Sequence, residues 1–260
     1  MIDLDDDFDG TFPFAPHIFD GHGFRQHYVD EGPRNGQVIV CLHGEPTWGY
    51  LYRNLIAPFS RQHRVIVPDH MGFGKSETPQ DRDYTLKTHV ENLVSLVEHL
   101  GLRDITLVGQ DWGGPIATAF TVRHPERVRR IFFANTIAGY GGVNDPDIPR
   151  ISDSPWFKWI DDGLQSGRTE QVLRNAGSTV LSVMKIIGFQ NSAAVTDTWI
   201  RAYSAPFPDW DSAIGAYEFP IDAHSGRIAP YVIEGASGVP DLVSKPAMLM
   251  EGMDDRAIPP

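Results

Sequence analysis

The stretch Ile105-Thr106-Leu107-Val108-Gly109-Gln110-Asp111-Trp112-Gly113-Gly114 decides the fold of this 260-residue chain. A short apolar run of β-prone residues stops at Gly109, and Gly113 and Gly114 open a segment with helical character. Small residues on both sides allow a tight strand-to-helix turn that exposes the central side chain, Asp111. A strand ending in a Gly-rich turn is the plainer interpretation. The pattern G-x-D-x-G otherwise predicts a nucleophile elbow, and the flanking sequence decides between the two.

Strands and helices alternate on both sides of this turn. Apolar and β-branched runs predict strands at residues 24–30, 38–42, 65–69, 105–108 and 130–134. Helical periodicity or composition predicts helices at residues 86–100 and 115–123. Such alternation predicts an α/β fold with a mainly parallel sheet and helices on both of its faces.

After Asn135 the sequence becomes rich in Gly, Pro, Asp and Trp, with helical stretches such as residues 170–187. Alternation returns with a strand at residues 247–250. We therefore expect the first part of the core at residues 1–136, an inserted and mostly helical cap at 137–244, and a continuation of the core at 245–260.

The composition is that of an ordinary globular protein and excludes several functional classes. A net charge of −12 argues against nucleic acid or an anionic membrane surface as a partner. No apolar run reaches the length of a membrane span, and the acidic start lacks the basic residues of a signal peptide. We therefore expect a cytoplasmic protein. The single cysteine, Cys41, lies in an apolar run and is expected to be a buried thiol.

The acidic start of the chain suggests a metal site but does not complete one. Asp5, Asp7 and Asp9, followed by Gly10, match the beginning of a calcium-binding loop. Pro16 stands where such a loop needs its bidentate glutamate. We therefore expect a solvated acidic tail and no metal.

Three segments carry a resemblance to a known family: Gly109–Gly114, His43–Arg53 and Ala202–Asp209. In them the chain resembles the haloalkane dehalogenases, which have the α/β-hydrolase fold and an aspartate nucleophile. The resemblance covers nearly the whole chain. It implies hydrolysis of a carbon–halogen bond to an alcohol and a halide through an aspartyl alkyl ester, without cofactor or metal. The implied partners are a small halogenated hydrocarbon and water, and we expect a monomer or weak oligomer.

Asp111 suits this chemistry independently of the resemblance. A carboxylate is ionised at neutral pH and needs no base to attack an sp³ carbon. A departing halide needs hydrogen-bond donors that are not acids, and an indole N–H is such a donor. The resemblance implies Trp112 as the first halide-binding residue. It also implies that the backbone N–H groups of Glu45 and Trp112 hold the oxyanion during ester hydrolysis.

The second halide-binding residue is expected in the cap. Family members with asparagine after His43-Gly44 use that side chain, whereas Glu45 places this chain with the branch that takes a second tryptophan from the cap. The candidates are Trp156, Trp159, Trp199 and Trp210. We select Trp159, because an aromatic pair at i and i+3 falls at about the family's distance after the nucleophile.

The triad acid is expected to be Asp255, in a turn after the last predicted strand, rather than its neighbour Asp254. Asn135 ends the earlier strand where another branch of the family carries glutamate, and an amide cannot act as that acid.

The catalytic histidine of the family follows the acid by a few dozen residues, and the sequence has no histidine after His224. His224 lies in the predicted cap, and His43 and His70 are expected to be structural. The chain is therefore expected to be either a fragment without its base or a protein that has lost turnover. We favour the fragment, because an end just after the acid turn leaves an edge of the core uncovered.

Two other functions remain open. An epoxide hydrolase shares the aspartate nucleophile and protonates the epoxide oxygen with cap tyrosines, a part that Tyr203 could take. A catalytically incomplete binding domain is the alternative from another class, motivated by the missing histidine.

Overall fold

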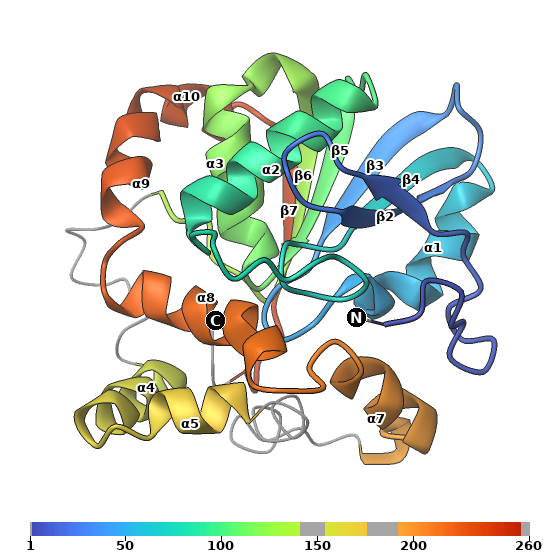
Figure 1. Cartoon of the computed structure of the whole chain (residues 1–260). Coiled ribbons are helices and arrows are strands. Elements are labelled where there is room, and N and C mark those ends of the chain that lie inside the picture. Colours follow the sequence, from blue (N-terminus) through green and yellow to red (C-terminus); the bar gives the residue numbers. More distant parts are fainter. Residues whose placement is uncertain (1, 141–153, 176–191, 256–260) are drawn as a thin grey trace.

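The computed structural model of the chain describes residues 2–140, 154–175 and 192–255. Its core is a seven-stranded sheet with the strand order β1-β2-β4-β3-β5-β6-β7 (Figure 1). The strands are β1 (His17–Phe19), β2 (Gln26–Glu31), β3 (Gln37–Leu42), β4 (His63–Pro68), β5 (Ile105–Gln110), β6 (Val128–Ala134) and β7 (Ala247–Met250). β2 pairs antiparallel with β1 and β4, and every other pair is parallel. The predicted, mainly parallel sheet is confirmed.

Helices connect the strands of the core. These are η1 (Gly49–Tyr52), α1 (Arg53–Ser60), α2 (Leu86–His99), α3 (Gly113–Arg123), η2 (Pro125–Arg127), α9 (Ala229–Gly235), η7 (Ala236–Gly238) and α10 (Val239–Val243). The side chain of Thr85 caps α2 by accepting a hydrogen bond from the N–H of Thr88, which satisfies one of the N–H groups left open at a helix start.

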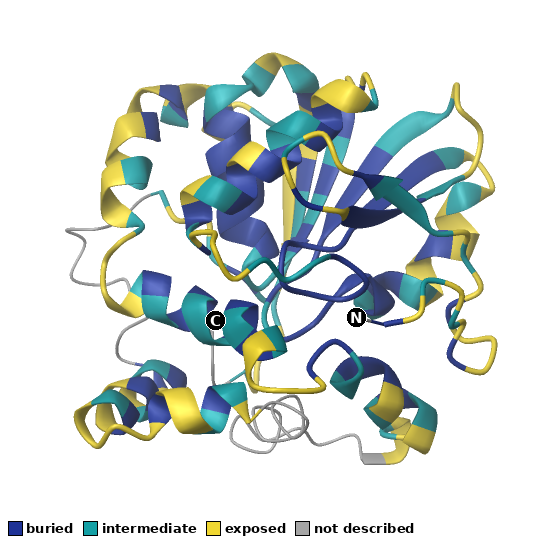
Figure 2. Cartoon of the chain, in the orientation of Figure 1, coloured by how far each residue is buried: buried dark blue, intermediate teal, exposed yellow. Residues whose placement is uncertain are grey.

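Burial along β5 shows that helices lie on both faces of the sheet. Successive side chains of a strand point to opposite faces. Ile105 and Leu107 are buried on the face covered by α3, and Gly113 to Val122 of α3 are themselves all buried (Figure 2). Val108 faces the side on which α1 packs against β4. The predicted layers are therefore present.

The second face is covered only in part. Beyond α1, half-buried side chains of β5 and β6 line an apolar groove together with β7. All four residues of β7 are exposed, and Met250 keeps 56 % of its surface accessible. Exposed apolar side chains therefore mark this edge of the sheet.

The cap lies over the carboxyl ends of the parallel strands. Its described elements are α4 (Pro155–Gln165), α5 (Thr169–Arg174), η5 (Ser192–Ala194), α7 (Asp197–Ser204), η6 (Asp211–Ala213) and α8 (Ile214–His224). Figure 1 shows α8 between the sheet and the pair α4 and α5, both of which it contacts. Most of the predicted helix at residues 170–187 lies outside the described residues.

The last helices of the predicted cap pack against the core. α9, η7 and α10 all contact α3, and Gly238 lies so close that a Cβ there would be 2.0 Å from the carbonyl oxygen of Val122. The boundaries at 136 and 244 stay predictions, and these contacts favour a boundary after α8. No helix within the described ranges is long and apolar enough to cross a membrane.

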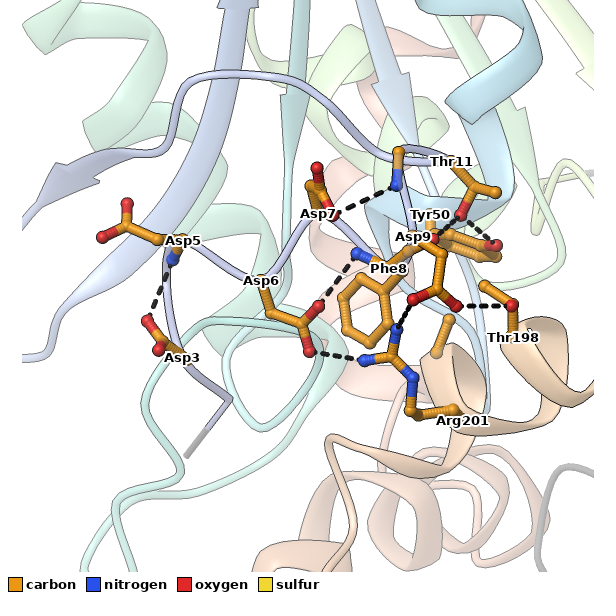
Figure 3. Close-up of polar contacts among 12 residues, drawn as sticks. Asp3, Asp5, Asp6, Asp7, Phe8, Asp9, Thr11, Tyr50, Thr198 and Arg201 are labelled. Carbon is orange, nitrogen blue, oxygen red and sulfur yellow. Dashed lines mark hydrogen bonds and ion pairs between the residues drawn. The ribbon is translucent and has the colours of Figure 1, made fainter.

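The acidic N-terminal segment is not a solvated tail, so that expectation is wrong. Phe8 and Phe12 are buried in the core, which anchors the segment. Figure 3 shows the guanidinium of Arg201, on α7, between the carboxylates of Asp6 and Asp9. Lys75 donates to the carbonyl oxygen of Asp6 at 2.8 Å. Phe8, Phe12 and these polar contacts together hold the segment on the fold.

Candidate active site

Asp111 occupies the strained corner of a strand-to-helix turn. Its φ is +51°, a left-handed conformation that costs a residue with a Cβ about 1–2 kcal/mol. Its N–H donates to the carbonyl oxygen of Asn135 at 3.1 Å. A Cβ at Gly113 would lie 2.0 Å from the carbonyl oxygen of Leu42, so the turn requires glycine there. The predicted nucleophile elbow is present, between β5 and α3.

The carboxylate of Asp111 is held by backbone donors. The N–H of Glu45 donates to Oδ1 at 2.8 Å, and the N–H of Trp112 is a second backbone donor to the same carboxylate. A Cβ at Gly44 would lie 2.1 Å from Oδ1, so only glycine lets the loop approach this closely. The backbone N–H groups that are expected to hold the oxyanion therefore converge on Asp111.

The pKa of Asp111 is raised to about 6. Burial is the main cause, because it disfavours the charged carboxylate, and the negative charge of Asp255 acts in the same direction. The hydrogen bonds from Glu45 and Trp112 stabilise the carboxylate and lower the pKa in part. Asp111 is therefore ionised at neutral pH, but it is a better nucleophile than a fully solvated carboxylate because it is poorly hydrated.

A mostly apolar cavity opens above Asp111, between the core and the cap. Its described walls are Glu45, Leu86, Asp111, Trp112, Pro115, Ile137, Gly139, Tyr140, Trp156, Phe157, Pro220, Ala223, Ile228 and Val232. Trp112, the N-cap residue of α3, stacks on Phe219 of α8, with ring centroids 4.6 Å apart and planes inclined by 12°. Core and cap thus meet directly beside Asp111, in a site suited to an apolar ligand.

The structure brings Trp112 and Glu45 to Asp111, but not Trp159. Trp156, one turn of α4 earlier, lines the cavity. Trp159 stacks against Trp156 with centroids 5.3 Å apart and is not among the cavity walls. Of the four candidate tryptophans of the cap, Trp156 lines the cavity, whereas Trp159, which we selected from the sequence, does not. Which helix face turns inward depends on the packing of α4 on α8, which the i, i+3 spacing does not specify.

Glu45 is also one of the residues that line the cavity. The Oε1 atom of its side chain is shielded from solvent and has no hydrogen-bond partner among the described residues. Burial raises the pKa of this carboxyl well above its ordinary value, and the charge of Asp111 adds to the effect. Both causes favour the protonated, uncharged form of the side chain. Sequence reasoning used only the backbone of Glu45 and gave no role to its side chain.

Asp255 lies at the same end of the sheet as Asp111. Its Oδ2 accepts a hydrogen bond of 2.7 Å from Nδ2 of Asn135, and the carbonyl oxygen of Asn135 accepts from the N–H of Asp111. Asp255 is half-buried, whereas Asp254 is exposed. The position fits the expected triad acid, with Asn135 as the neighbour that orients it.

No histidine lines the cavity, and this holds for all ten histidines because each lies within the described residues. His224 pairs with Asp161 of α4, with 3.3 Å between Nε2 and Oδ1. His43 accepts through Nε2 from the N–H of His70, so its Nδ1 carries the proton donated to the carbonyl oxygen of Gly44. Burial lowers the pKa of His43 to about 4. His43 and His70 are neutral structural residues, as expected.

Tyr203 does not face the cavity. It is buried against Tyr50 and Trp199, with ring centroids at 5.3 and 4.5 Å. Tyr140 is the tyrosine in the cavity wall. Tyr203 is therefore not positioned as the proton donor that the epoxide hydrolase alternative assigned to it. Within the described residues no cluster of His, Cys, Asp or Glu could hold a metal ion.

Comparison with known proteins agrees with this geometry. A protein family described as the alpha/beta hydrolase fold matches residues 37–260. A cis-3-alkyl-4-alkyloxetan-2-one decarboxylase of Shewanella oneidensis is 33 % identical over 95 % of this chain and 76 % of its own length. A haloalkane dehalogenase of Psychrobacter cryohalolentis is 38 % identical over 81 % of this chain, which spans 65 % of that enzyme.

Among solved structures, the tetrameric haloalkane dehalogenase DpaA of Paraglaciecola agarilytica has a TM-score of 0.71 and 26 % identity. The match covers 95 % of this chain and 89 % of that one. The resemblance inferred from three short segments is therefore confirmed over most of the chain.

Proposed function

This chain belongs to the α/β-hydrolase family, and within that family we propose that it has the chemistry of a haloalkane dehalogenase. The observation that carries the proposal is the buried carboxylate of Asp111, fixed by the N–H of Glu45 at the floor of an apolar cavity. A haloalkane offers such a site an apolar body and an sp³ carbon with a leaving group. Asp111 attacks that carbon, the carbon–halogen bond breaks, and an alkyl ester of Asp111 forms.

The departing halide needs donors that do not themselves react. The indole of Trp112 borders the cavity next to the nucleophile, and Trp156 of α4 is the second indole in the wall. We assign halide binding to Trp112 and, from its place in the cavity, to Trp156 in preference to Trp159. Their N–H groups stabilise the developing negative charge in a site from which water is largely excluded.

Hydrolysis of the ester uses the backbone donors a second time. When water attacks the acyl carbon, the negative charge develops on the oxygen beside the N–H groups of Glu45 and Trp112. Asp255 is proposed as the acid that orients a base. None of the histidines of this chain lines the cavity, so for haloalkanes the 260 residues supply the first half-reaction.

The test is halide release from 1-bromohexane. The chain is expected to release bromide rapidly, up to about one ion per chain, because loss of a general base slows the second step by about 10²–10⁴-fold. Asp111→Asn should release none. A bromide burst of equal size in Asp111→Asn would refute Asp111 as the nucleophile, and no burst in the folded chain would favour the binding-domain alternative.

A second function is favoured by a specific observation. The decarboxylase of Shewanella oneidensis matches 95 % of this chain, more than the dehalogenase from Psychrobacter cryohalolentis does. An oxetan-2-one is a strained four-membered lactone with an sp³ carbon bonded to oxygen. Attack of Asp111 on that carbon breaks the carbon–oxygen bond and leaves an alkyl ester with a free carboxylate next to it.

This intermediate can break down without water or base. Carbon dioxide departs from the carboxylate end, a carbon–carbon double bond forms, and the carboxylate of Asp111 leaves. The sum is lactone to alkene plus carbon dioxide, with Asp111 regenerated. Incubation with a dialkyl-oxetan-2-one distinguishes the two functions: sustained alkene formation supports the decarboxylase, whereas no alkene from a chain that releases bromide excludes the decarboxylase and supports the dehalogenase.

The remaining expectations stay proposals. A cytoplasmic location and a monomeric or weakly associating state are proposed from the composition, and gel filtration with light scattering tests the second. DpaA, one of the similar proteins, is tetrameric. A tetramer of this chain in solution would contradict our expectation.

A further inference from the structure

We propose that the side chain of Glu45 is a proton donor to oxygen leaving groups, which makes the site able to open epoxides and to complete their hydrolysis. The inference rests on Asp111 as the nucleophile, which is part of the proposed function. Glu45 takes the place of a cap tyrosine as the acid in ring opening, and it then acts as the base in ester hydrolysis.

The geometry singles out Glu45 among the polar groups of the cavity. Its backbone N–H fixes Oδ1 of Asp111 at 2.8 Å, and both residues line the same cavity. Glu45 and Asp111 therefore border the space in which a reacting carbon would lie. Oε1 of Glu45 has no hydrogen-bond partner among the described residues although it is shielded from solvent. A buried polar atom without a partner is costly, and a substrate oxygen at this position would satisfy it.

Burial acts on both carboxyl groups of the loop and the elbow. The pKa of Asp111 is about 6, so this group is ionised at neutral pH. Burial and the charge of Asp111 raise the pKa of Glu45 well above its ordinary value, which favours its protonated form. A carboxylate next to a protonated carboxyl can divide the roles of nucleophile and proton donor.

Ring opening uses both groups at once. Asp111 attacks a ring carbon of the epoxide, the bond from that carbon to oxygen breaks, and the proton of Glu45 moves to the departing oxygen. The products are a hydroxyalkyl ester of Asp111 and a carboxylate at Glu45. Without the proton the leaving group would be an alkoxide, which is a far stronger base than a halide and departs poorly.

The carboxylate produced in this step is the base for the next one. Water attacks the acyl carbon of Asp111 while Glu45 accepts one proton from it. The oxyanion forms beside the N–H groups of Glu45 and Trp112. Collapse of the intermediate releases the diol, whose new hydroxyl takes the remaining proton, and Asp111 returns as a carboxylate. Glu45 is again protonated, and the sum is epoxide plus water to diol.

A haloalkane does not prepare Glu45 in this way. A halide departs as an anion without a proton, so Glu45 stays a neutral acid and cannot accept the proton of the attacking water. The same chain is therefore expected to stop at the ester with a bromoalkane and to turn over with an epoxide. A purely structural role of Glu45 would not produce this difference between substrates.

The experiment compares two substrates of the same length, 1-bromohexane and 1,2-epoxyhexane, each in excess over the 260-residue chain. We expect many diols per chain but no more than about one bromide, with a stable ester on Asp111 after the bromoalkane only. In Glu45→Gln the diol rate divided by the bromide burst rate should fall about 10²–10⁴-fold. The ratio cancels any loss of folded protein or of binding common to both reactions.

Matched variants exclude the other proton donors. Tyr140 lines the cavity and accepts a hydrogen bond from Arg123 at 3.3 Å, and Tyr203 is the buried cap tyrosine. Tyr140→Phe and Tyr203→Phe should each keep the ratio of diol rate to bromide burst rate within a few-fold.

Three outcomes overturn the inference. They are a bromide burst without diol formation in the unaltered chain, an unchanged ratio in Glu45→Gln, and a large fall of the ratio in Tyr140→Phe. Absence of both products refutes the nucleophile, and with it the proposed function. Should Glu45→Gln fail to fold, the contrast between the two substrates in the unaltered chain decides.

Discussion

Gly44 lies so close to Asp111 that a Cβ on it would be 2.1 Å from Oδ1 of the carboxylate. This contact allows the N–H of the next residue, Glu45, to donate to the same oxygen. The same loop thus positions the carboxylate of Asp111, supplies the N–H that we propose as an oxyanion donor, and contributes Glu45 to the lining of the cavity.

Gly44→Ala should therefore displace the carboxylate and slow ester formation by about 100-fold or more, because misplacement of a reacting group by about 1 Å has an effect of this size. The measurement is the bromide burst rate of a sample whose circular dichroism matches that of the unaltered chain. A folded Gly44→Ala chain with an undiminished burst would show that the loop does not position Asp111.

The pH dependence of ester formation follows from the pKa of Asp111, about 6. Only the carboxylate attacks, so activity is lost as pH falls through 6, and the rate at pH 5 should be about a tenth of that at pH 8. Burst rates between pH 4.5 and 8.5 measure the profile. A rate that stays constant down to pH 4.5 would mean that burial does not raise this pKa.

The same pKa predicts a stability difference. A carboxyl whose folded-state pKa is raised costs the fold nothing below its unfolded pKa, 3.8, and costs it most above about 6. Asp111→Asn removes the cost, so the variant should be more stable than the original chain at pH 7.5 by about 1–3 kcal/mol. The difference should shrink towards pH 4. Urea unfolding at both pH values tests it, and a less stable variant at pH 7.5 would contradict the prediction.

Substitutions of the two cap tryptophans test which of them binds the halide. Trp156 lines the cavity and Trp159 stacks behind it. Trp156→Phe removes one N–H but keeps an aromatic ring, and a hydrogen bond to a charged group contributes about 1.5–3 kcal/mol, so the burst rate should fall about 10–100-fold. Trp159→Phe should change it only a few-fold. The reverse order would restore the assignment made from sequence.

The core and the strand-to-helix turn at Asp111 could be predicted because local sequence determines them. Neighbouring residues in the sequence are enough to determine three features: the β5 strand, the glycine-rich turn around Asp111 and the loop at Glu45. The turn needs glycine at position 113 because a Cβ there would clash with the backbone of Leu42. The second glycine of the G-x-D-x-G pattern meets this requirement.

The remaining features depend on contacts between distant residues. Trp156 rather than Trp159 reaches the cavity because α4 packs on α8. The acidic N-terminus is held by Phe8 and Phe12, which pack on Trp48 with ring centroids at 5.5 and 5.0 Å. The raised pKa of Glu45 results from its burial beside Asp111. No periodicity or motif in the sequence predicts these contacts.

Peptide mass spectrometry after reaction with 1-bromohexane shows which residue is the nucleophile. We expect a hexyl group on the peptide that contains Asp111, in an amount equal to the bromide released, and fragmentation should locate it on this residue. The modification should be absent from Asp111→Asn treated in parallel. A hexyl group on Glu45 or Asp255 instead, or bromide release without any ester on Asp111, would show that Asp111 is not the nucleophile.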